Sequence, residues 1–174
     1  MAFGLALIGF ALLFMALPKN ESKADSLYSV VPAPVNYTAP ELSLKTIDGT
    51  AESLADYRQD IVLVNNWATW CPPCKAEMPV LAAYYNEHHS EGFTIVAIEA
   101  GDSADVVSPF VQNYGLKFTV WLDPKGASLR AFGNGNLPNS YVIDRAGTVR
   151  YAWTGEISQP MLEKYLTPLL TEEN

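Results

Sequence analysis

The chain has 174 residues, of which 49% are apolar, a size and composition that suit one domain with a substantial core and exclude a disordered tail. It carries 11 basic and 19 acidic residues, and the net charge of -8 disfavours contact with nucleic-acid phosphates, so we expect no nucleic-acid partner. Its two cysteines are too few for a four-cysteine zinc site or for a scaffold held by several disulfides.

Residues 1–18 are strongly apolar, and every charged side chain of the protein lies at Lys19 or later. As a helix, Ala2–Pro18 would span about 26 Å, close to the ~30 Å hydrocarbon layer of a membrane. The segment is either a single N-terminal membrane anchor or a cleaved signal peptide, and the absence of a nearby small-x-small cleavage site favours the anchor. We therefore expect a cell-membrane protein whose domain faces the extracytoplasmic side, or a secreted or periplasmic protein if the segment is removed.

Residues 19–40 show neither a helical nor a strand period. Pro32, Pro34 and Pro40 favour extended backbone in this stretch. We expect an extended linker here, followed by a domain over residues 41–174.

The domain at 41–174 shows alternating strand and helix patterns. Residues 41–46 alternate between apolar and polar, and Asp48-Gly49 is a hairpin turn signal, so an N-terminal β-hairpin is expected. Further strands are expected at 61–67, 93–98, 118–122, 140–143 and 148–153, and helices at 72–89, 104–114 and 158–170. The strand–helix–strand order over 61–98 predicts a parallel βαβ unit. The fold class is therefore α/β, with a central mixed sheet flanked by helices.

Both cysteines lie in Cys71-Pro72-Pro73-Cys74, where the strand at 61–67 gives way to a helix. A helix N-terminus stabilises a thiolate, and the spacing lets the second thiol attack a mixed disulfide formed at the first. We expect Cys71 to be the exposed attacking thiol and Cys74 the resolving thiol of a redox-active disulfide that needs no further cofactor.

Other readings of the two cysteines are weaker. The only histidines, His88 and His89, are adjacent at a polar helix end, so no metal site is predicted. Attachment of a c-type haem requires a histidine after the second cysteine, where this chain has Lys75.

The segment from Trp67 to Lys75 resembles the active-site segment of the thioredoxin superfamily, and in particular its TlpA/ResA-like, membrane-tethered branch. The resemblance covers roughly residues 40–170 and implies a thioredoxin-like fold and a thiol-disulfide oxidoreductase. Pro79 matches the proline that kinks the active-site helix of the family. Pro138, which follows Leu137 just before the strand at 140–143, resembles the family's cis-proline that faces the disulfide.

The chain departs from thioredoxins at Asn65, where they carry a buried aspartate that accepts the proton of the second thiol. An asparagine cannot take this proton. Glu77 matches a glutamate that ResA-like proteins carry after the second cysteine, which implies a catalytic role. Glu99, at the end of the strand at 93–98, is a second candidate for a proton relay. The alternative for both acids is a solvated surface charge.

Three residues are expected to bind substrate: Trp70, Pro72 and Leu137. Trp70 could equally shield the disulfide from water. Pro72 and Pro73 have no backbone N–H, so Cys74 supplies the nearest backbone donor to a Cys71 thiolate. A thiolate with few donors is less stable, and we therefore expect a reducing couple.

The resemblance implies protein disulfide substrates, which include apocytochrome c in cytochrome c biogenesis, and a transmembrane thiol relay as electron donor. A general disulfide reductase or oxidant for other exported proteins is the alternative within this class. A copper-handling protein would need a longer cysteine spacing and a histidine near the site. A peroxide-reducing protein usually carries a lone reactive cysteine in a different motif.

Overall fold

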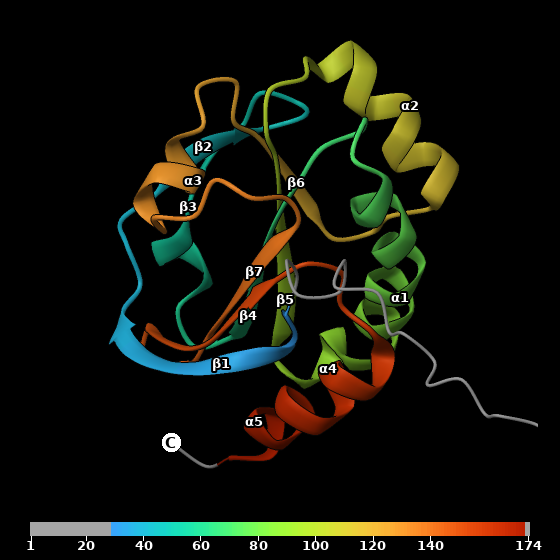
Figure 1. Ribbon diagram of the computed structural model, residues 1–174. Helices are drawn as coiled ribbons and strands as arrows, with labels where there is room; N and C mark the ends of the chain where they lie inside the picture. The colour runs from blue at the N-terminus through green and yellow to red at the C-terminus, as the bar shows by residue number, and fades with distance from the viewer. Residues whose placement is uncertain (1–28, 173–174) are drawn as a thin grey trace, which may run out of the picture.

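The computed structural model describes residues 29–172, so the expected anchor or signal peptide at 1–18 lies outside the described residues. Over 29–172, no helix is both long enough and apolar enough to cross a membrane. The described chain forms an eight-stranded mixed sheet with helices on both faces, which confirms the predicted α/β class (Figure 1).

The sheet has the strand order β1-β8-β7-β4-β5-β6-β2-β3. Its strands are β1 (Ser29–Thr38), β2 (Ser43–Thr46), β3 (Ala51–Ser53), β4 (Ile61–Trp67), β5 (Phe93–Glu99), β6 (Thr119–Leu122), β7 (Asn139–Ile143) and β8 (Thr148–Thr154). Strands β4, β5 and β6 run parallel, and the remaining pairs are antiparallel. The predicted N-terminal hairpin is confirmed as β2–β3, and the predicted βαβ unit as β4–α1–β5.

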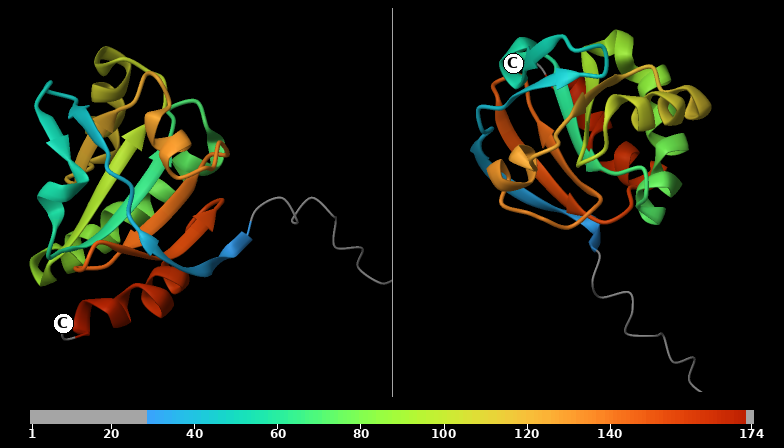
Figure 2. Two further views of the ribbon diagram at one scale, coloured as in Figure 1. Left: turned by 90° about the vertical axis from the view of Figure 1, so that its left-hand side faces the viewer. Right: turned by 90° about the horizontal axis from the view of Figure 1, so that it is seen from above.

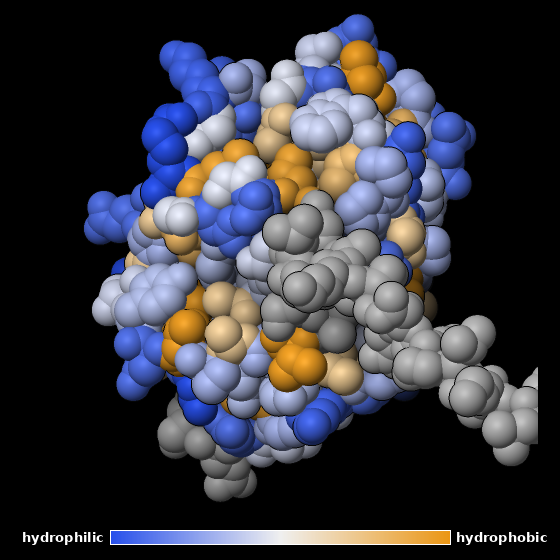
Figure 3. Space-filling view, in the orientation of Figure 1, coloured by the Kyte–Doolittle hydropathy of each residue, from blue (hydrophilic) through white to orange (hydrophobic). Residues whose placement is uncertain are grey.

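The helices are α1 (Pro72–His88), α2 (Ala104–Tyr114), α3 (Ala127–Ala131), α4 (Gln159–Tyr165) and α5 (Thr167–Thr171), with short 3-10 turns η2 (Leu54–Tyr57) and η3 (His89–Glu91). Figures 1 and 2 show α1, α2 and α4 on one face of the sheet and α3 on the other. The view in Figure 3 shows hydrophilic residues around the rim of the molecule, with hydrophobic residues in separate groups between them.

Strand β4 lies at the centre of the sheet and is buried along its whole length. Because side chains alternate along a strand, its residues contribute to two cores. Leu63 and Trp67 join the cluster under α1 and α4, whereas Val62 and Val64 join the cluster on the opposite face. This buried strand carries the cysteine motif at its carboxyl end.

The expectation of a linker over 19–40 is wrong for its second half, because Ser29–Thr38 forms the edge strand β1. It pairs antiparallel with β8, for example at Ala33–Ala152 and Tyr37–Val149. Proline is tolerated at the edge of a sheet, where its missing N–H need not pair with a neighbour. The ordered domain therefore extends at least to Ser29.

The prediction of a single closing helix at 158–170 is also wrong, because two helices, α4 and α5, meet at Leu166. Pro168 stands in the first turn of α5, where it cannot continue a preceding helix because it has no N–H. The short helix α3 was not expected from the sequence.

Candidate active site

The cysteine motif begins helix α1. Cys71 is the N-cap residue, and its Sγ accepts a hydrogen bond from the backbone N–H of Cys74 at 3.4 Å. Pro72 and Pro73 occupy the first helical positions and offer no N–H. The backbone N–H of Cys74 is therefore a donor to the sulfur of Cys71 in the disulfide state, and its contact with a Cys71 thiolate stays a prediction.

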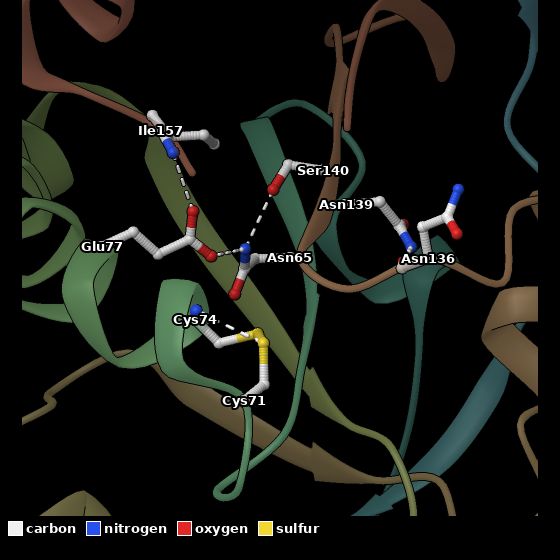
Figure 4. Close-up of a disulfide and its surroundings, with 8 residues drawn as sticks. All are labelled: Asn65, Cys71, Cys74, Glu77, Asn136, Asn139, Ser140 and Ile157. Carbon is white, nitrogen blue, oxygen red and sulfur yellow. Dashed lines mark hydrogen bonds between the residues drawn. A yellow bond between two sulfur atoms is a disulfide. The ribbon is translucent and has the colours of Figure 1, made fainter. Parts of the chain in front are cut away.

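Cys71 and Cys74 form a disulfide. Cys74 has no exposed surface and Cys71 is 4% exposed, so the expectation of a freely exposed Cys71 is wrong for this state. The disulfide holds Sγ of Cys71 against the first turn of α1, as Figure 4 shows. Cys71 is still the more accessible of the two sulfur-bearing residues.

Trp70 precedes the disulfide and is 64% exposed, the highest value among the large hydrophobic residues that the structure describes. Its loop is tied down by Thr69, whose hydroxyl donates to the Asp102 carboxylate at 2.5 Å. Pro72, the first residue of α1, is also exposed. Trp70 and Pro72 therefore lie at the surface beside the disulfide, where a protein substrate could contact them.

The Leu137–Pro138 peptide bond is cis, as the resemblance implied. Pro138 directly precedes β7, whose first residue Asn139 pairs with Asn66 on β4. Pro138 therefore lies at the same end of the sheet as the cysteine motif, close to the carboxyl end of β4. Leu137 is half-buried and packs against the core.

Glu77 is fully buried on α1, so the alternative of a solvated surface charge is wrong for it. Its Oε1 accepts a hydrogen bond from Asn65 Nδ2 at 2.8 Å, and its Oε2 accepts one from the Ile157 backbone N–H at 2.9 Å (Figure 4). Glu77 follows Cys74 by three residues, which places both on the same face of the helix.

Burial raises the pKa of Glu77 to about 8, against the two hydrogen bonds from Asn65 and Ile157, which lower it. A carboxylic acid with this pKa exchanges protons near neutral pH, as a general acid or base must. Glu77 can therefore exchange a proton near neutral pH, which Asn65 cannot, and its catalytic role stays a prediction.

Glu99 is also fully buried and lies opposite Trp67 in the parallel register of β4 and β5. Its Oε2 accepts the backbone N–H of Asp102 at 2.7 Å. Burial raises the pKa of Glu99 to about 7. The Asp102 carboxylate also accepts the Thr69 hydroxyl, so Asp102 links Glu99 to the loop that carries Trp70. The proposed relay role of Glu99 stays a prediction.

The amide pair Asn66–Asn139 was not predicted from the sequence. Asn66 Nδ2 donates to Asn139 Oδ1 at 2.9 Å, and Asn139 Nδ2 donates to the carbonyl of Asn136 at 2.5 Å. These bonds fix the loop that leads into Pro138. A signal was present, because an amide in the otherwise apolar strand at 61–67 must find a partner when buried.

The sequence matches the AhpC/TSA family over residues 35–152. It is 34% identical over 132 residues to the thiol-disulfide oxidoreductase ResA of Geobacillus thermodenitrificans, covering 76% of each chain. The chain belongs to the ResA-like branch of this family. ResA of Bacillus subtilis is 35% identical over 128 residues, which are 74% of this chain and 72% of that protein.

A solved structure of a thiol:disulfide interchange protein of the thioredoxin family from Chlorobium tepidum is also similar. It has a TM-score of 0.70 and 29% identity, and the match covers 79% of this chain and 99% of that one. The ResA-like chain is thus a thiol-disulfide oxidoreductase with a thioredoxin-like fold.

Proposed function

We propose that this ResA-like protein is an extracytoplasmic reductant of protein disulfides, in which Cys71 attacks the substrate and Cys74 resolves the mixed disulfide. The observation that carries this proposal is the buried Glu77, on the same helix face as Cys74 and with a pKa of about 8. The resolving cysteine is fully buried, so it needs an internal group to take its proton before it can attack.

The reaction proceeds in two exchanges. The Cys71 thiolate attacks one sulfur of the substrate disulfide, forms a mixed disulfide and releases the other substrate sulfur as a thiolate. The Cys74 thiolate then attacks Sγ of Cys71, which forms the Cys71–Cys74 disulfide and releases the second substrate thiolate. Two electrons pass from the protein to the substrate, the dithiol loses two protons, and the two substrate thiolates take up two.

Glu77 would accept the proton of Cys74 during the second exchange. With a pKa of about 8 in the disulfide state, Glu77 holds that proton at neutral pH once the exchange is complete. The departing substrate thiolate takes its proton from solvent, and Glu77 gives its own proton back to Cys74 when the Cys71–Cys74 disulfide is next reduced. The hydrogen bonds from Asn65 and Ile157 keep the carboxylate in one orientation throughout.

The reducing direction is supported by the two prolines between the cysteines. A thiolate at the N-cap of a helix is ordinarily stabilised by the N–H groups of the second and third helical positions. Pro73 removes one of these two donors, so the reduced form is less stable and gives up its electrons more readily.

The client we propose is apocytochrome c, whose haem-attachment cysteines must be reduced before haem is added. A transmembrane thiol relay would supply the electrons, and the apolar segment at 1–18 would hold the domain at the membrane. The relatives named ResA and the extreme apolar composition of that segment support this placement. Other exported proteins with disulfides are the alternative clients.

Trapping clients in living cells tests the proposal. A Cys74→Ser variant cannot resolve its mixed disulfide, so its clients stay bound through Cys71 and can be identified by mass spectrometry. We expect the proteins held as mixed disulfides with Cys71 to be exported proteins with a C-x-x-C-H segment. Clients without this segment would indicate a general reductase, and cytoplasmic clients alone would refute the extracytoplasmic placement. A Cys71→Ser/Cys74→Ser variant is the matched control for non-specific capture.

A further inference from the structure

His88 is the last residue of α1 and is only 7% exposed. Its ring packs on Tyr84, with ring centroids 4.3 Å apart, and its Nδ1 lies 3.2 Å from Oε2 of Glu91. The other ring nitrogen, Nε2, is buried and has no hydrogen-bond partner among the described residues. A buried imidazole nitrogen without a partner needs an explanation, and a bound ion is one that the neighbouring side chains can supply with ligands.

Two carboxylates lie beside this histidine. One oxygen of Glu87, one oxygen of Glu163 and a ring nitrogen of His88 all lie within 4.8 Å of one another. Glu163 belongs to α4 and accepts hydrogen bonds from Thr167 Oγ1 at 3.0 Å and Gln159 Nε2 at 3.4 Å. The cluster therefore joins the end of α1 to α4.

Nδ1 of His88 faces the Glu91 carboxylate at 3.2 Å. A neutral imidazole that donates its Nδ1–H to a carboxylate has its lone pair on Nε2, and this is the arrangement by which proteins prepare a histidine to bind a metal. Imidazole and carboxylate are ligands of Zn²⁺ and related divalent ions. Glu87 and Glu163 would also neutralise the charge of the ion.

We propose that His88, Glu87 and Glu163 form a binding site for a divalent transition-metal ion such as Zn²⁺, with water in the remaining coordination position. Tetrahedral ligand atoms about 2.1 Å from zinc lie about 3.4 Å apart. The two glutamates are exposed, so small rotations of their side chains bring their oxygens to this spacing.

This site is separate from the disulfide. Along α1, His88 lies 17 residues after Cys71, or about 25 Å at the rise of an α-helix. The ion would clamp α1 to α4 at the end remote from Glu77, which already contacts Ile157 just before α4. No metal site was predicted from the sequence, because Glu163 is far from His88 along the chain.

Zinc titration of the full-length chain tests the proposal. The protein is purified in mild detergent without a histidine tag and kept oxidised, because the free thiols of Cys71 and Cys74 would themselves bind zinc. Calorimetry is expected to show one Zn²⁺ per chain and a higher unfolding temperature of the loaded protein. Absence of one-to-one binding would overturn the proposal.

Three variants locate the bound ion. His88→Gln and Glu163→Gln are each expected to weaken zinc binding by about tenfold or more, since each removes one ligand. His89→Gln is the matched control, because His89 is the adjacent histidine, exposed and outside the cluster. Wild-type affinity in both ligand variants, or an equal loss in His89→Gln, would refute the site. If His88→Gln does not fold, Glu163→Gln decides alone, with an unchanged thiol-disulfide exchange rate as the check of its fold.

Discussion

Asn65 Nδ2 lies 2.8 Å from Oε1 of Glu77 and 2.9 Å from Oγ of Ser140, so one buried amide links helix α1 to strand β7 across β4. The Asn65 hydrogen bond lowers the pKa of Glu77, whereas burial raises it to about 8. An asparagine side chain cannot accept a proton itself, but Asn65 lowers the pH at which Glu77 ionises.

Replacing Asn65 with alanine is expected to raise the pKa of Glu77, because the carboxylate loses one of its two donors. The pH midpoint of mixed-disulfide resolution, measured by stopped-flow fluorescence, should move upward, and the protein should lose about 1–3 kcal/mol of stability. In Glu77→Gln the same pH dependence should disappear. An unchanged midpoint in Asn65→Ala, or an unchanged profile in Glu77→Gln, would exclude Glu77 as the proton acceptor.

The two buried acids predict how stability changes with pH. Glu77 and Glu99 have folded-state pKa values of about 8 and about 7, both above the ordinary value of 4.5. Above pH 4.5 the unfolded chain releases these protons while the folded chain keeps them, so stability is fully present below that pH and falls as pH rises to about 8.

Thermal unfolding of the oxidised protein between pH 5 and pH 8 measures this effect. The unfolding temperature should fall across the interval, and the fall should be smaller in Glu77→Gln, which has no ionisable group at that position. Asp105→Asn, at an exposed residue whose pKa is lowered, is the control for a general change in charge. Equal slopes in the wild type and Glu77→Gln would contradict the raised pKa.

The prolines between the cysteines predict the redox potential. Pro73→Ala restores an N–H at the second helical position, where it can donate to a Cys71 thiolate. One added hydrogen bond of about 1 kcal/mol should make the potential about 20 mV less negative, as measured against glutathione. Pro72→Ala, at the first position, restores an N–H that does not point at the N-cap side chain and should leave the potential unchanged. A more negative potential in Pro73→Ala would be inconsistent with the explanation.

Trp70 is predicted to contact protein substrates. Because its side chain is 64% exposed, Trp70→Ala should change the unfolding temperature little. It should raise the KM for a disulfide-bonded protein while leaving exchange with a small disulfide unchanged. Faster exchange with both substrates would instead indicate that Trp70 shields the disulfide.

Local patterns predicted the elements that surround the active site. The apolar run at 61–67, the cysteine motif and the helix after it follow from hydrophobic period and capping chemistry, which act over a few residues. Strand β1 escaped prediction because its prolines suit an edge strand as well as a linker, and only pairing with the distant β8 selects the strand.

The candidate site was predicted only in part, because local patterns identify some of its residues and long-range contacts place the others. Cys71, Cys74, Glu77 and Pro138 carry recognisable motifs, whereas the Asn66–Asn139 pair and the Ile157 N–H depend on contacts between distant segments. Burial of Glu77 and Glu99 is likewise a property of the packed fold. Their perturbed pKa values could not be known before the helices and strands around them were placed.

The most direct test of the proposed reaction is a single-turnover experiment with reduced protein and an oxidised C-x-x-C-H peptide. Quenched samples analysed by mass spectrometry should show a mixed disulfide at Cys71, followed by the Cys71–Cys74 disulfide and one fully reduced peptide per chain. Cys74→Ser should stop at the mixed disulfide, and Cys71→Ser should not react. Attachment of the peptide to Cys74, or failure of the reduced protein to reduce the peptide, would contradict the account.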